Sequence, residues 1–142
     1  MVLGTACERD AAPGGDKPDL GPRVLQLDSA RVDLPDSIRQ LVVRLDRSTA
    51  ADFEPASAGL RTGDIVRFEA VDAGGHAIAF DGERLMPEAR AWLEATGQLR
   101  SPPLVNAGNA WVITLADSPP GEYPFVCATH GARGTLTVSA RP

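Results

Sequence analysis

The chain has 142 residues, of which 43% are hydrophobic and 23% are charged, and its formal net charge is −5 at pH 7. This length suits one domain with a sizeable buried core. The acidic balance argues against a nucleic-acid-binding protein, which would carry a basic stripe, and no apolar run approaches the roughly 20 residues of a membrane span. Twelve prolines and 14 glycines favour a β-rich chain with many turns.

Residues 1–22 are predicted to form a disordered tail and linker, and residues 23–142 a single domain. The tail begins small and apolar and turns polar after Cys7, with the composition of a linker. The segment Gly4-Thr5-Ala6-Cys7 resembles the end of a bacterial lipoprotein signal, in which the lipidated cysteine would tether the protein to a membrane. The alternatives are an incidental cysteine and a Cys7–Cys127 disulfide, which would stabilise little because it ties down only a tail.

Alternating and β-branched residues predict a series of short strands separated by turn signals. Turns are expected at 34–37, 60–64 and 73–75. Strands at intervals of roughly 8–12 residues indicate an all-β sandwich or barrel. The strands are expected at Val24–Leu27, Leu41–Leu45, from Phe53 onward, Ile65–Val71, Ala77–Phe80, Trp111–Leu115 and on both sides of a loop near residue 130.

Residues 85–97 interrupt the β pattern and predict one short amphipathic helix. Pro87 suits the first turn of a helix, and Gly97 suits the position just past its end. The apolar face is expected to pack on the sheets or to lie over the end that carries the candidate ligands. Its members are Leu85, Ala89, Trp92 and Leu93.

The stretch from Gly121 to Val138 predicts a strand, a short loop and a second strand. Cys127 and His130 lie three residues apart in that loop, and the only other histidine, His76, begins the strand at 77–80. One thiolate and two imidazoles form the His₂Cys set of copper electron-transfer sites. The residues therefore predict one metal site made of His76, Cys127 and His130.

Four segments of the chain resemble, in order, the cupredoxin family of plastocyanin- and amicyanin-like small blue copper proteins. The segment Pro120–His130 is similar to the family hallmark Gly-x-Tyr-x-Phe-x-Cys-x-x-His. Leu60–Phe68 is similar to the strand and turn before the first ligand, His76–Asp81 to the first ligand and its strand, and Gly134–Val138 to the closing strand.

The resemblance implies a cupredoxin-like Greek-key β-sandwich of eight strands over residues 40–140, with the helix as an insertion. It also implies that His76, Cys127 and His130 hold one mononuclear copper ion. The family often carries Asn directly after the first ligand, where this chain has Ala77.

The chain lacks the axial methionine that the family usually places a few residues past the second histidine. Amicyanin-like spacing leads to Arg133 and plastocyanin-like spacing to Thr135, and neither is a thioether. Met86 is an alternative axial ligand. Otherwise the fourth position stays empty or takes a weak backbone carbonyl, or it takes water or a small ligand, or the site binds no metal.

The expected function is a one-electron carrier in the bacterial cell envelope, in the periplasm or on the outer face. We expect a monomer that binds redox partner proteins. His130 is the expected solvent-side ligand, through which electrons would leave the site. The alternatives are an open-site copper-binding or delivery protein and a metal-free interaction module. An enzyme is not expected, because no carboxylate pair, nucleophile triad or phosphate loop stands out.

Overall fold

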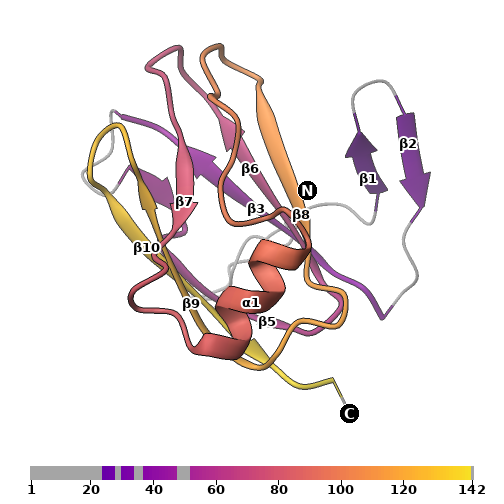
Figure 1. The fold of residues 1–142 in the computed structure, drawn as a ribbon. Coiled ribbons are helices and arrows are strands. Elements are labelled where there is room, and N and C mark those ends of the chain that lie inside the picture. The colour runs from indigo at the N-terminus through magenta and orange to yellow at the C-terminus, as the bar shows by residue number, and fades with distance from the viewer. Residues whose placement is uncertain (1–23, 28–29, 34–36, 48–51, 142) are drawn as a thin grey trace, which may run out of the picture.

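The computed structural model describes residues 24–27, 30–33, 37–47 and 52–141, which form two packed four-stranded sheets, one hairpin and one helix (Figure 1). The strands are β1 Val24–Leu27, β2 Ala30–Asp33, β3 Gln40–Leu45, β4 Phe53–Glu54, β5 Ser57–Arg61, β6 Ile65–Ala70, β7 Ile78–Phe80, β8 Ala110–Thr114, β9 Gly121–Cys127 and β10 Arg133–Ser139, and the helix is α1 Pro87–Ala95. One sheet has the order β5-β10-β9-β7 and the other β4-β3-β6-β8, while β1 pairs with β2.

The predicted all-β sandwich with one inserted helix is confirmed, and the predicted strands lie within a residue or two of the observed bounds. Three features were not predicted: strand β2, a separate strand β5 whose last residues fall in the turn expected at 60–64, and the parallel pairing of β3 with β6 and of β10 with β5. The parallel pairings join segments that are distant in sequence, as in a Greek key, so no local sequence pattern predicts them. The predicted tail at 1–22 and most of the turn at 34–37 lie outside the described residues.

The core between the sheets is built around the aromatic ring of Phe125 on β9. Alternate residues of this strand point inward and are fully buried, as the two-residue period predicts. The Phe125 ring stands edge-on to Phe53, Phe68 and Phe80, with centroid distances of 4.9, 5.3 and 6.1 Å. Each such pair adds about 0.5–1.5 kcal/mol beyond area burial, which anchors the strand that ends at Cys127.

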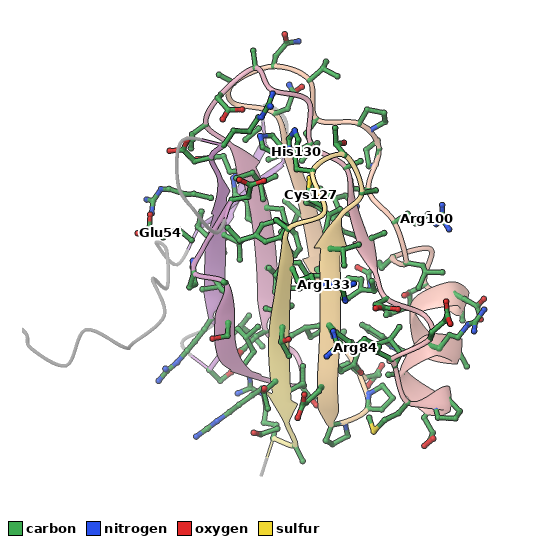
Figure 2. The ribbon with its side chains drawn as sticks, turned by 90° about the vertical axis from the view of Figure 1, so that its left-hand side faces the viewer. Glu54, Arg84, Arg100, Cys127, His130 and Arg133 are labelled. Carbon is green, nitrogen blue, oxygen red and sulfur yellow. The ribbon has the colours of Figure 1, made fainter. Side chains whose placement is uncertain are left out.

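The helix packs on the sandwich away from the loop that joins β9 to β10 (Figure 2). Ala89 and Leu93 are fully buried. The helix therefore packs on the sheets and does not lie over the end that carries the candidate ligands. Met86 precedes the helix, and its side chain lies so close to Gly121 that a Cβ there would overlap it. Gly121 and Cys127 are the two ends of β9, roughly 20 Å apart, so Met86 as an axial ligand is wrong.

The chain that returns from the helix covers the outer edge of β7. This strand is the last in its sheet. Ser101 bonds to Ile78 twice, because its N–H donates to the Ile78 carbonyl at 2.8 Å and its hydroxyl accepts the Ile78 N–H at 2.9 Å. His76 and Leu104 exchange two backbone hydrogen bonds of 2.9 and 2.8 Å. The segment 101–104 therefore fixes both β7 and the backbone of His76.

Candidate metal centre

The structure brings His76, Cys127 and His130 together at one end of the sandwich. His76 lies just before β7, Cys127 ends β9, and His130 follows in the loop to β10 (Figure 2). One donor atom of each residue lies within 4.8 Å of the other two. Three segments that are distant in sequence therefore present two imidazoles and a thiol to one point.

Burial separates the three side chains from solvent to different degrees. His76 is 1% exposed and Cys127 is 0% exposed, whereas the side chain of His130 is 13% exposed. Cys127 is a free thiol, whereas Cys7, its partner in the alternative disulfide, lies outside the described residues. Of the three residues, His130 lies nearest the surface, as expected for the solvent-side position.

The loop that carries Cys127 and His130 is closed by its own backbone. The Cys127 carbonyl accepts the N–H groups of His130 and Gly131 at 3.2 and 2.7 Å, and the Cys127 N–H donates to the Ala132 carbonyl at 2.8 Å. Gly131 has a φ of +77°, in the left-handed region that glycine adopts without strain. The turn therefore holds the thiol and the second imidazole at a fixed spacing.

A backbone hydrogen bond joins this loop to the one that carries the other histidine. The N–H of Ala128 donates to the carbonyl of Ala77 at 2.7 Å, and Cys127 stands opposite Ile78 in the β7–β9 ladder. The family often has an asparagine at the position of Ala77. Here the main-chain carbonyl of Ala77, and not a side chain, supports the neighbouring loop. The two ligand-bearing loops are thus linked directly to each other.

The side chain of His76 is oriented by Asp72. Its Nε2 lies 2.8 Å from Oδ1 of Asp72, and that carboxylate also accepts the backbone N–H groups of Arg47 and Gly74, both at 2.8 Å. The two backbone hydrogen bonds, followed by the contact with His76, lower the pKa of Asp72 to about 2. An ionised carboxylate is only an acceptor, so Nε2 carries the hydrogen.

The opposite nitrogen of the same ring is thereby left as a lone pair. Nδ1 of His76 is buried and has no hydrogen-bond partner, which is unusual for a polar atom in a protein interior. A ligating histidine commonly donates its other N–H to a carboxylate, which fixes the tautomer and raises the basicity of the ligand. The Asp72–His76 pair has this arrangement.

The ring of His130 meets both a thiol and a carboxylate through one nitrogen. Its Nδ1 lies 3.4 Å from Sγ of Cys127 and 3.4 Å from Oδ2 of Asp52, while its Nε2 is buried without a partner. Nitrogen and sulfur ligands of one tetrahedral ion lie about 3.5 Å apart. The Nδ1–Sγ distance therefore suits two donors to the same metal.

The donor set also fits the expected metal chemically. A soft thiolate and two imidazoles suit copper, and a bound metal keeps the thiol deprotonated. Sequence reasoning did not find Asp72 or Asp52. Asp72 had a signal, since it stands four residues before His76 and is separated from it by a glycine turn, whereas Asp52 is far from both histidines in sequence.

Comparison with known proteins gives the same fold and the same chemistry. Residues 41–139 match the family described as copper binding proteins of the plastocyanin/azurin family. A mutant plastocyanin of fern is 26% identical, with a TM-score of 0.54, and the match covers 69% of this chain and 99% of that one. An oxidized methionine-to-leucine mutant of amicyanin is 21% identical, with a TM-score of 0.51, and the match covers 69% and 80%.

A larger copper protein also contains this fold. The copper-containing nitrite reductase from Thermus scotoductus is 19% identical, with a TM-score of 0.56, and the match covers 84% of this chain but 25% of the reductase. The range matched to the family includes all three clustered residues, His76, Cys127 and His130.

Proposed function

The chain belongs to the plastocyanin/azurin family of copper binding proteins, and from that premise we propose that it carries single electrons between redox partner proteins. It is a cupredoxin, and its cofactor is one mononuclear copper ion. We assign His76, Cys127 and His130 as the ligands. The observation that carries the proposal is the convergence of these three donors within 4.8 Å, on loops joined by backbone hydrogen bonds.

Copper held by one thiolate and two imidazoles supplies a couple between Cu(I) and Cu(II). The protein's part is to keep the donors in place while the charge changes. The backbone of His76 is fixed to Leu104, and the loop of Cys127 is fixed to Ala77. Because His130 is the most exposed of the three, we assign it as the point at which electrons enter and leave.

Burial of the site supports a carrier rather than an enzyme. His76 and Cys127 are at most 1% exposed, and an electron crosses a thin protein layer that a substrate does not. The nitrite reductase among the structural neighbours shows that this fold also occurs within an enzyme. The proposal of a non-enzymatic carrier therefore rests on the site and not on the fold.

A second candidate function is the binding and delivery of copper. It is favoured by the position of Met86, whose side chain lies against Gly121 at the end of β9 far from Cys127. A site without a thioether exchanges its ion more readily if nothing else fills that place. Fast transfer of copper to a chelator would favour delivery, and slow transfer with a fixed potential would favour electron transport.

We propose that the protein works in the bacterial cell envelope as a monomer, tethered through a lipid on Cys7. The support is the resemblance of the segment 4–7 to a lipoprotein signal and the linker composition that follows; both lie outside the described residues. Within the described part of the chain, no helix has the length and apolarity to cross a membrane. A lipid adduct on Cys7, sought by mass spectrometry of envelope extracts, tests the tether.

The decisive experiment adds one equivalent of Cu(II) to the wild-type protein, to Cys127→Ser and to Cys7→Ser. We expect an intense thiolate-to-copper charge-transfer band in the wild type and in Cys7→Ser, and its loss in Cys127→Ser. Voltammetry of the wild type should show a reversible one-electron couple. A band that survives in Cys127→Ser would refute the ligand assignment, and the lack of a reversible couple would refute the carrier function.

A further inference from the structure

A carboxylate that the copper chemistry described so far does not use lies beside the cluster. The side chain of Asp52 is 16% exposed, and its Oδ2 lies 3.4 Å from Nδ1 of His130. Asp52 directly precedes β4 and has a φ of +62°, a conformation that is uncommon for residues other than glycine. Among the contacts of the described residues, that nitrogen is the partner of the carboxylate.

The two aspartates at this end face different nitrogens of their histidines. Asp72 contacts Nε2 of His76, which leaves Nδ1 of that ring unpartnered. Asp52 instead contacts Nδ1 of His130, the same atom that lies 3.4 Å from Sγ of Cys127. Asp72 is therefore placed behind a ligand, whereas Asp52 contacts the nitrogen of His130 that faces the thiol, although its carboxylate lies outside the group of three donors within 4.8 Å of one another.

Binding of a metal changes what Asp52 can contact. A ring nitrogen that gives its lone pair to a metal carries no hydrogen, so Nδ1 of His130 could then no longer donate to the carboxylate. Carboxylates shielded from water are paired, hydrogen-bonded or bound to metals. Once that donor is lost, a cation bound to Nδ1 of His130 would lie next to the Asp52 carboxylate, which needs only a turn of its side chain to become a ligand.

Asp52 also stands on the flank of the site from which a thioether is missing. The N–H of Thr135 in β10 donates to the carbonyl of Ala56 at 2.9 Å, and Thr135 pairs with Ser57 at the start of β5. The segment that leads from Asp52 into β5 thus runs beside the first residues of β10. Those residues occupy the positions, Arg133 and Thr135, where the family's methionine is expected.

We propose that the carboxylate of Asp52 is the fourth donor to the copper ion, in the place of the usual thioether. This inference rests on the proposed function of the site and specifies which ion it holds best. A carboxylate is a harder donor than a thioether. With one thiolate and one carboxylate, the centre is neutral as Cu(II) and carries a charge of −1 as Cu(I). Asp52 therefore stabilises Cu(II) and lowers the reduction potential.

The test compares Asp52→Asn with Glu54→Gln, which removes the same charge two residues away. Glu54 is exposed and lies on the outer side of β4, away from Cys127 and His130 (Figure 2). Competition with a Cu(II) chelator should show at least a tenfold loss of affinity for Asp52→Asn, while affinity measured with a Cu(I) chelator changes less than threefold. Each tenfold fall in the ratio of Cu(II) affinity to Cu(I) affinity raises the reduction potential by about 59 mV, and voltammetry measures that rise. Glu54→Gln should match the wild type in all three measurements.

Asparagine tolerates a positive φ, so Asp52→Asn is expected to fold, and Asp52→Gly is a second variant that accepts the same backbone. Unchanged Cu(II) affinity in both variants, or an equal loss of Cu(I) and Cu(II) affinity, would overturn the proposal. If the wild type itself forms no thiolate-to-copper band, the proposed function fails. If the band forms but the potential of Asp52→Asn equals that of the wild type, only the role of Asp52 fails.

Discussion

Two aspartates at opposite ends of the sandwich, Asp64 and Asp52, differ in how many partners their carboxylates have. At the end away from the cluster, Asp64 is 2% exposed and accepts the backbone N–H groups of Arg39 and Arg61 at 3.1 and 2.8 Å. It also pairs with the guanidinium of Arg141 at 2.8 Å. At the cluster end, the carboxylate of Asp52 has one contact among the described residues, with Nδ1 of His130 at 3.4 Å.

This difference separates a carboxylate that holds the fold together from one that is available to a ligand. Asp64 joins three chain segments, and both of its oxygens already accept hydrogen bonds. Two neutral atoms, Oε1 of Gln40 and Oγ of Ser118, also lack partners, so an unpartnered atom alone does not mark a site. The cluster end differs in that two imidazole nitrogens, Nδ1 of His76 and Nε2 of His130, lack partners close to a thiol, and a carboxylate with few partners contacts His130.

The largest effect on stability is expected at the end that carries Asp64. Asp64→Ala should lower the free energy of unfolding of the metal-free protein by about 3 kcal/mol, because it leaves a guanidinium and two N–H groups without their acceptor. Urea denaturation measures this loss. Copper affinity should stay within a factor of two of the wild type, and a larger change would show that the two ends are not independent.

At the cluster end, Asp72→Asn should affect the metal more than the fold. Loss of the charged acceptor behind His76 should weaken copper binding about 10–100-fold, as measured by chelator competition. Nitrogen NMR of the zinc-loaded protein should show a weakened hydrogen bond at Nε2 of His76. The exposed helix residue Glu94 supplies a matched control, Glu94→Gln, which should change neither quantity. Wild-type affinity in Asp72→Asn would mean that the pair only orders the loop.

A smaller effect is expected at Tyr123, which is the only tyrosine of the chain. Its hydroxyl donates to the Pro119 carbonyl at 2.6 Å, and burial raises the pKa of Tyr123 to about 12. The contribution of this group to stability is therefore complete below pH 10 and is lost as the pH rises toward 12. Tyrosinate absorbance measures the titration directly, and a midpoint near pH 10 in the folded protein would contradict the burial.

Removing the same hydroxyl gives a stability measurement that does not depend on pH. Tyr123→Phe should cost about 1 kcal/mol, since the Pro119 carbonyl loses its donor while the ring remains buried. The copper spectrum should be unaffected, because Tyr123 is four residues from Cys127 on the far side of the Phe125 ring cluster along β9. A spectral change would link the two ends of the molecule.

The sequence alone predicted the parts of the site that are chemically rare or locally encoded. Only two histidines exist in the chain, so the pairing of His76 with the Cys127–His130 loop needed no knowledge of the fold. The strands were predictable from the two-residue alternation that β9 retains in the structure. The helix was predictable because Pro87 and Gly97 bound its apolar pattern.

The residues that tune the site could not be predicted, because their roles depend on long-range pairing. Asp52 reaches His130 only because the segment before β5 runs beside β10, and β5 pairs with β10 in parallel. Nothing in the local sequence distinguishes Asp52 from the other aspartates of the chain, so its position beside His130 could not be predicted. Met86 shows the converse, since its residue type suggested a ligand and its position against Gly121 gives it a packing role.

The segment that covers β7 bears on how copies of the protein meet one another. An uncovered edge strand offers unpaired N–H and C=O groups on which another chain can build a mixed sheet. Here Ser101 and Leu104 occupy such groups beside the first ligand, and the exposed Pro102 and Pro103 between them have no N–H to offer. Another copy of the protein would therefore meet side chains at this edge, and β7 would not serve as a template for aggregation.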